Sequence, residues 1–286
     1  MTMIAHNNGI AARTDPSEDD VIEQLTGRRH VSWSQLSGYR GCPRRWHFSH
    51  VESVEPSHIS SALVLGSSFH DTVQYHFEQR MIDQASDHDV LCDVFQQAWD
   101  DNVGDIPIRY SKTENEASAK STGIRMLKAF SESDLASPPG TIIGIEETLS
   151  GSIHPELPTL TARLDLCYLT DNALVVIDWK SSRSRWSATK AEECSDQLLL
   201  YGELASDLAP SLPVQLSFGI VTKAVKPAVQ KLDIPVETAK RADKVIEQLL
   251  PVYRGMKAGI DYPNPTPMCS GCGYKHRCPA FNRTRQ

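Results

Sequence analysis

Two aspartates and a lysine stand at the ends of apolar, strand-like stretches. Asp165 closes the run 160–164, and Asp178 closes the run 173–177, with Lys180 two residues further on. Burying a carboxylate is costly unless a cation or hydrogen-bond donors compensate for the lost water. Two strands joined by the turn at 170–172 would bring both carboxylates together, and like charges at short range favour a divalent ion. Oxygen ligands predict Mg²⁺ or Mn²⁺.

The lysine adds a further element of the same chemistry. Asp178 and Lys180 are two residues apart on one strand, so both side chains project onto the same face. An ammonium group beside a divalent ion can orient or activate a water molecule and neutralise charge on a phosphate. This is the equipment for phosphodiester hydrolysis. A salt bridge at a strand end is the alternative interpretation of the same residues.

The hydrophobic periodicity predicts the elements that carry these residues. Helical spacing occupies residues 31–51 (after a short extended stretch), 62–82, 90–99, 118–130, 192–208 and 236–257. Strand-like runs occupy 141–149, 160–169, 173–179, 214–222 and 228–234. This order predicts an α/β fold, a mixed central sheet flanked by helices, with a helical lobe (71–140) ahead of the sheet. Residues 1–28 are predicted to be a flexible tail, and 29–286 one domain.

A second group of chemically active residues is formed by cysteines. Cys269, Cys272 and Cys278 cluster in a C-terminal segment, 262–286, and Cys42 stands beside Pro43 near the other end of the chain. Three thiolates need a fourth metal ligand, and Cys42 and His276 are the two candidates. The His276 alternative would suit zinc and leave Cys42 free. Joining positions so far apart would stabilise the fold by roughly 5 kcal/mol, by analogy with disulfides.

Charge and composition narrow the class of protein. The net charge of −7 excludes a uniformly basic coat, but residues 26–50 hold five arginines and no acid. Arg44 and Arg45 are therefore predicted to contact DNA phosphates, with solvated helix ends as the alternative. The sequence shows no apolar run of the roughly 20 residues that span a bilayer and no secretory signal, so we expect an intracellular protein without membrane contact.

The ordered motifs resemble one nuclease family. Asp165 followed by the triplet 178–180 resembles the motif pair of the PD-(D/E)XK nuclease superfamily. The flanking motifs resemble its RecB-like exonuclease branch, which includes AddB-type and CRISPR-associated nucleases. These motifs are residues 32–36 with Tyr39, Cys42 and Pro43, then 66–70, and then Gln197 with Tyr201. The order runs from about residue 31 to 281.

The resemblance implies a restriction-endonuclease-like sheet and a role for each matching residue. The catalytic metal would be held by His70, Asp165, Asp178 and the carbonyl of Trp179. Lys180 would activate or orient the attacking water, Gln197 and Tyr201 would help hold the DNA strand, and Arg163 would touch a phosphate. Glu146 or Glu147 would add an acid. Ala162 departs from the glycine usual in the family.

The resemblance also implies a cofactor for the cysteines. A [4Fe–4S] cluster would be held by Cys42, Cys269, Cys272 and Cys278, and would clasp the N-terminal and C-terminal segments together. The Cys-Pro ending favours iron–sulfur over zinc.

These features together predict a Mg²⁺- or Mn²⁺-dependent DNA exonuclease. It would prefer single-stranded or frayed ends and act in recombination, repair or replication. The sequence contains no phosphate-binding loop of a helicase, so unwinding would come from a partner helicase or recombination protein. The alternative is a DNA-end-binding subunit of a recombination or CRISPR spacer-capture complex with little activity alone. A free-standing iron–sulfur redox protein would explain only the cysteines.

Overall fold

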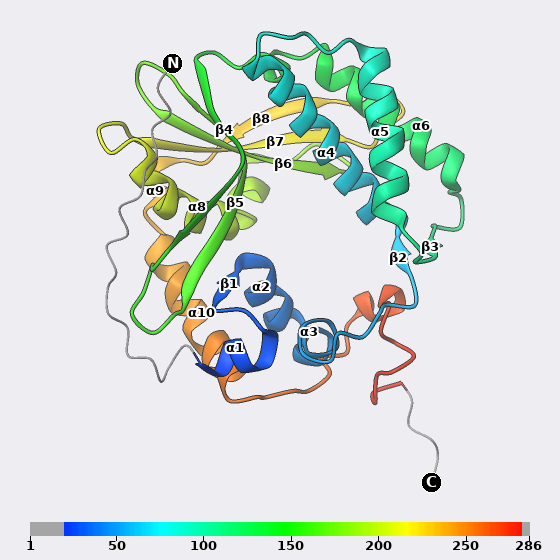
Figure 1. Cartoon of the computed structure of the whole chain (residues 1–286), viewed down its shortest axis with the longest axis vertical. Helices are drawn as coiled ribbons and strands as arrows, with labels where there is room; N and C mark the ends of the chain where they lie inside the picture. Colours follow the sequence, from blue (N-terminus) through cyan, green and yellow to red (C-terminus); the bar gives the residue numbers. More distant parts are fainter. Residues whose placement is uncertain (1–19, 282–286) are drawn as a thin grey trace.

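A six-stranded mixed sheet lies at the centre of the computed structural model, which describes residues 20–281 (Figure 1). Its strands are β1 (His30–Ser32), β4 (Thr141–Gly151), β5 (Thr159–Leu169), β6 (Leu174–Ser182), β7 (Val214–Thr222) and β8 (Val229–Asp233). The strand order is β1-β5-β6-β7-β8, and β4 pairs with β5 as well. The β4-β5-β6 and β7-β8 pairs are antiparallel, whereas β1-β5 and β6-β7 are parallel. The predicted mixed α/β fold is confirmed.

Helices cover both faces of this sheet. They are α1 (Asp20–Thr26), α2 (Trp33–Gly41), α3 (Pro43–His50), α4 (Ser61–Met81), α5 (His88–Val103), α6 (Glu116–Ser131), α7 (Ala188–Glu193), α8 (Asp196–Ala205), α9 (Val236–Ala239) and α10 (Ala242–Lys257). One core joins α4, α5 and α6 to one face of the sheet, and a second joins α2, α8 and α10 to the other. None of the helices in this described part is long and apolar enough to cross a membrane.

Two short strands and three 3-10 turns complete the fold. The strands β2 (Ile59–Ser60) and β3 (Ile108–Arg109) pair in parallel beside the helical layer. The turns are η1 (Asp134–Ala136), η2 (Ser206–Leu208) and η3 (Pro267–Gly271). Figure 1 shows the C-terminal segment with η3 lying next to α3 and near β2 and β3, although these elements are far from it in the sequence. Segments from the two ends of the chain and the helical layer therefore meet in one region.

The predicted flexible tail was wrong for its last residues. Residues 20–26 form α1, because Ile22 is buried in the core shared by α2 and α10 and only 1% of it is exposed. The three large apolar side chains of this short segment, Val21, Ile22 and Leu25, are too few to give a periodic signal. Residues 1–19 of the predicted tail lie outside the described residues.

The chain divides at Cys42, where one long helix was predicted. Ser32 caps α2 through a capping box with Gln35, and this part agrees with the predicted extended start. Cys42 then adopts an extended conformation (φ −162°, ψ 101°), and Pro43 begins α3. Proline disfavours a helical conformation in the preceding residue, so the break follows from the sequence.

The ladder between β5 and β6 opens part-way along the sheet. Their pairing runs from Leu169↔Leu174 to Leu166↔Ile177 and stops there. The next two residues in this register are Asp165 and Asp178. On the same edge of β5, pairing resumes only at Thr161, with β1. We call this opening the fork.

Candidate functional site

The two aspartates lie at the mouth of the fork. The backbone N–H of Trp179, which would otherwise point at a strand partner, donates a 2.7 Å hydrogen bond to Asp165 Oδ2. The Trp179 ring packs between Phe77 and Phe130 in the α4–α6 core. Strand alternation therefore turns Asp178 toward the opposite face of β6. The fork is thus lined from both faces of the sheet.

Two further groups converge on Asp165. His70, from the middle of α4, places Nδ1 at 3.4 Å from Asp165 Oδ2. Glu146, on β4, lies opposite Asp165 in the register, between the pairs Ile145↔Leu166 and Glu147↔Leu164. Ligand atoms of His70, Glu146 and Asp165 all lie within 4.8 Å of one another. One imidazole and two carboxylates at this spacing form a donor set that fits a divalent cation.

The structure distinguishes Glu146 from Glu147, which the sequence left open. Glu146 has a positive φ of 49°, a conformation that costs a non-glycine residue free energy, and its side chain is only 13% exposed. Glu147 is exposed to solvent. The Glu146 carboxylate contacts the Nε of Arg163. The unusual backbone conformation thus turns Glu146, not Glu147, toward the fork. No periodic pattern in the sequence indicates this conformation.

The crowding of carboxylates perturbs their acidity. Burial raises the pKa of Glu146 to about 7, and the nearby Asp165 adds to this effect. Burial also raises the pKa of Asp165, and Asp178 raises it further. Burial lowers the pKa of His70, favouring the neutral imidazole that binds metals. The site therefore concentrates more negative charge than its own cations balance, which is the electrostatic condition for holding a cation.

Lys180 begins a chain of polar contacts toward α8. Its Nζ lies 2.6 Å from Asp178 Oδ2 and donates to Gln197 Oε1 at 3.4 Å. Gln197 Nε2 in turn donates to the hydroxyl of Tyr201 at 2.8 Å. Burial alone lowers the pKa of Lys180, but Asp178 and then Asp165 outweigh burial and raise it. The lysine is therefore an ammonium group held beside the carboxylates by a residue pair one helical turn apart.

Comparison with known proteins identifies the family. Residues 30–279 match the PD-(D/E)XK nuclease superfamily, which is most of the chain and includes the whole fork. The chain belongs to the PD-(D/E)XK nuclease superfamily. Membership implies a metal-dependent nuclease acting on DNA, and the acidic fork is a possible metal site for it.

A solved structure shares the fold of this PD-(D/E)XK nuclease at low sequence identity. A protein from Eubacterium rectale whose description reads "Putative exonuclease" matches with a TM-score of 0.58 and 12% identity, over 96% of this chain and 95% of that one. The protein SSO0001 matches with a TM-score of 0.34 and 17% identity, over 86% and 95% of the two chains. No curated protein matches the chain. The first similarity supports the restriction-endonuclease-like fold.

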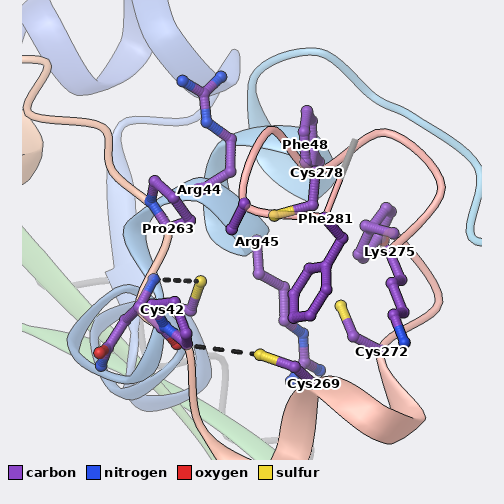
Figure 2. Close-up of a pocket in the computed structure, with 14 residues that line it drawn as sticks. Cys42, Arg44, Arg45, Phe48, Pro263, Cys269, Cys272, Lys275, Cys278 and Phe281 are labelled. Carbon is purple, nitrogen blue, oxygen red and sulfur yellow. Dashed lines mark hydrogen bonds between the residues drawn. The ribbon is translucent and has the colours of Figure 1, made fainter. Parts of the chain in front are cut away.

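The four cysteines of the predicted cluster site line one pocket of the nuclease (Figure 2). Cys42 lies between α2 and α3, Cys269 lies in η3, and Cys272 and Cys278 follow it. Backbone N–H groups of Asn264 and Thr266 donate to the sulfurs of Cys42 (3.5 Å) and Cys269 (3.4 Å). Such donors stabilise thiolates, and this donor chemistry fits a thiolate-bound metal group.

The sulfurs are nevertheless not gathered into a cluster geometry. Within residues 20–281, no three cysteine sulfurs lie within 4.8 Å of one another, in contrast to the ligand atoms of the fork. Phe48 and Phe281 line the same pocket and occupy part of the space between the two segments. His276, the alternative zinc ligand, is not among the lining residues; its Nδ1 lies 3.1 Å from the carbonyl oxygen of Gly273.

The remaining predicted DNA contacts separate into two places. Arg163 lies at the fork, paired with Glu146 and 62% exposed. Arg44 and Arg45 line the cysteine pocket instead. The Arg44 guanidinium forms a 2.9 Å ion pair with Asp261, so its charge is balanced within the protein, whereas Arg45 is exposed.

Proposed function

We propose that this protein is a RecB-like DNA exonuclease that hydrolyses single-stranded or frayed DNA ends with Mg²⁺ or Mn²⁺ bound in the fork. One observation carries the proposal. Ligand atoms from α4, β4 and β5 (His70, Glu146 and Asp165) converge within 4.8 Å, directly beside the Asp178–Lys180 pair. Convergence of three separate elements on one point is not expected of a simple surface salt bridge.

Each residue of the fork has a distinct task in this mechanism. His70, Glu146, Asp165 and Asp178 would hold the divalent cation together with the carbonyl of Trp179. The cation, when bound, supplies Lewis-acid stabilisation of the phosphate and eases deprotonation of water. Lys180, kept protonated by Asp178, orients the attacking water by donating a hydrogen bond and offsets the charge that develops on the phosphate.

The polar chain on α8 positions both the lysine and the substrate. Gln197 accepts from Lys180 and donates to Tyr201, which fixes the direction in which the ammonium group points. The face of α8 beside the fork would contact the DNA strand through the same two side chains. Arg163, exposed next to Glu146, would contact a neighbouring phosphate.

A [4Fe–4S] cluster held by Cys42, Cys269, Cys272 and Cys278 would serve as a structural clasp. The four residues come from both ends of the chain and line one pocket, with two N–H donors directed at the sulfurs. Binding would draw the sulfurs together and lock the N-terminal helices to the C-terminal segment. Single strands would reach the fork through a partner helicase or recombination protein.

The proposal is tested with protein purified anaerobically. End-labelled single-stranded DNA in Mn²⁺ should be shortened from its ends, whereas a circular single strand should remain intact. Replacing Asp178 by asparagine should abolish cutting while DNA binding in Ca²⁺ persists. Uncut linear DNA in the presence of intact wild-type protein would refute the nuclease proposal, and cutting of circles would refute the exonuclease mode.

A further inference from the structure

A basic cavity outside the fork has no part in the mechanism so far. It lies between the helical layer and the sheet, with a volume of about 760 Å³. Its lining includes four cationic side chains from separate segments: Arg109 of β3, Lys112 in the turn after it, Arg183 beyond the end of β6, and Lys223 beyond the end of β7. This volume lies within the range of about 300–1,000 Å³ that is usual for ligand-binding sites.

The positive charge of this cavity is poorly balanced within the protein. In the described part of the chain, none of the four cations forms an ion pair with a carboxylate within 4.0 Å. Glu114 is the acidic residue of the lining, and its Oε2 accepts a hydrogen bond from Ser61. Burial lowers the pKa of Lys223; Glu114 opposes this effect and Arg183 adds to it. An anionic ligand would relieve this repulsion, in a chain whose net charge is −7.

The backbone also favours an anion at this place. The first turn of α4, a helix of 21 residues capped by Ser60, opens into the cavity, since Ser60, Ser61 and Ala62 line it. The positive end of the helix dipole therefore adds to the four side-chain charges. Charges from side chains and from a helix terminus thus converge on one space.

The same elements connect the cavity to the fork. Lys180 and Arg183 are three residues apart, about 10 Å along an extended chain. Ser61 and His70 are nine residues apart on α4, about 14 Å along a helix. Stacked nucleotides of one DNA strand follow each other every 3.4 Å or so, and unstacked ones lie further apart, so the separation from Lys180 to Arg183 corresponds to at most about three nucleotides.

One side of the cavity contacts the loop that carries Cys269 and Cys272. The Arg109 guanidinium donates to the carbonyl of Ser270, between Cys269 and Cys272, and Gly271 lines the cavity. Ser57 N donates to the carbonyl of Gly273 at 2.9 Å. The loop therefore fixes the position of Arg109 relative to the sheet.

We propose that this cavity is a backbone-binding subsite for the nucleic-acid strand, in which Arg109, Lys112, Arg183 and Lys223 hold phosphates within about three nucleotides of the bond cut in the fork. The inference rests on the proposed nuclease function and extends it with a second contact region. Phosphate contacts position a strand without reading its sequence, so the subsite would be sequence-independent.

The experiment measures binding separately from cutting. The affinity of a fluorescein-labelled oligothymidylate of about 20 nucleotides is measured in Ca²⁺ over a range of NaCl concentrations. Arg183→Gln and Lys112→Gln each remove one charge from an exposed lining residue. Each is expected to weaken binding roughly fivefold and to reduce the slope of log K against log[NaCl] by about 0.7, the contribution of one single-strand phosphate contact. Lys226→Gln is the matched control, an exposed charge near Lys223 that does not line the cavity.

A neutral phosphate analogue tests direct contact. Methylphosphonate is placed at successive positions along the strand, and its effect is compared between wild type and Arg183→Gln. A position at which the two changes are non-additive identifies the phosphate that Arg183 contacts. Additive effects at every position, together with the same salt slope for Arg183→Gln and Lys226→Gln, overturn the proposal.

The outcome separates the subsite from the proposed function. If wild type cuts in Mn²⁺ but the cavity variants bind like the control, the nuclease stands and the subsite is wrong. If wild type does not cut but the cavity variants lose affinity and salt slope, the subsite stands as a nucleic-acid site and the nuclease proposal is wrong.

Discussion

Replacing Glu146 by glutamine gives the sharpest test of the fork, because the adjacent Glu147 offers a matched control. Both changes remove one carboxylate from β4. Glu146 lies within 4.8 Å of the ligand atoms of His70 and Asp165, whereas Glu147 is exposed. We expect Glu146→Gln to stabilise the metal-free protein, to weaken Mn²⁺ binding and to slow cutting, and Glu147→Gln to do none of these.

The stability gain follows from the raised pKa of Glu146. A rise from 4.5 to about 7 means that ionised Glu146 destabilises the folded state by about 3 kcal/mol. Screening by the solvent that still reaches this carboxylate reduces the figure to about 2 kcal/mol. The folded state retains the proton longer than the unfolded state, so wild-type stability falls as pH rises from 4.5 to about 7. The gain in Glu146→Gln is therefore fully present at pH above 7 and absent below 4.5.

At the same pH, the loss of Mn²⁺ affinity in Glu146→Gln should lower the stability of the metal-bound protein. Removing even an outer partner of a metal site costs 10- to 100-fold, so loss of a direct carboxylate should cost about 100-fold. At a fixed excess of Mn²⁺ this amounts to about 2.7 kcal/mol less stabilisation by the ion. The variant would thus be the more stable protein without metal and the less responsive one with it.

Urea unfolding at pH 8, with and without Mn²⁺, measures both effects in one experiment, and calorimetric titration gives the affinity. A merely structural role for Glu146 would change the metal-free stability alone. Equal Mn²⁺ affinity for Glu146→Gln and Glu147→Gln would show that Glu146 is no ligand and that the carboxylate crowding has another cause.

Three further changes probe other parts of the argument. Lys180→Met should lower the cutting rate about a thousandfold without lowering Mn²⁺ affinity; parallel losses of both would contradict its assignment to the water and phosphate. Cys42→Ser should remove visible absorption near about 400 nm and lower the melting temperature, whereas unchanged absorption would show that Cys42 is not a cluster ligand. Ile22→Ala should destabilise the fold by about 2–4 kcal/mol in urea unfolding, and a negligible change would mean that α1 is not docked in solution.

Much of the fold could be predicted because its strands carry strong periodic signals. The runs predicted at 141–149, 160–169 and 214–222 correspond to β4, β5 and β7 within two residues at each end. These strands carry apolar residues at most of their inward-facing positions, so their limits are visible in the sequence. The short strands β1, β2 and β3 have no such signal, since two or three residues cannot establish a period.

The fork itself could be anticipated only in part. The sequence identified Asp165 and Asp178 as charges at the ends of apolar runs, and the register places them as successive partners at the point where the ladder opens. The sequence could not show that β5 has an unpaired stretch on one edge, between the residues that pair with β1 and those that pair with β6. That gap is a property of the sheet topology and not of either strand.

The gap explains why groups from both faces of the sheet can meet at one point. In a continuous sheet, backbone hydrogen bonds would separate His70 on the α4 face from Lys180 and Gln197 on the α8 face. Because the ladder stops at Leu166↔Ile177, the N–H of Trp179 is released to bind Asp165, and the two layers are joined through the opening. Glu146 enters the same opening only because its backbone takes a positive φ that the β4 pattern does not predict. The chemistry of the site thus depends on the point at which the pairing of β5 with β6 ends. Sequence periodicity indicates the paired parts of strands but not that end point.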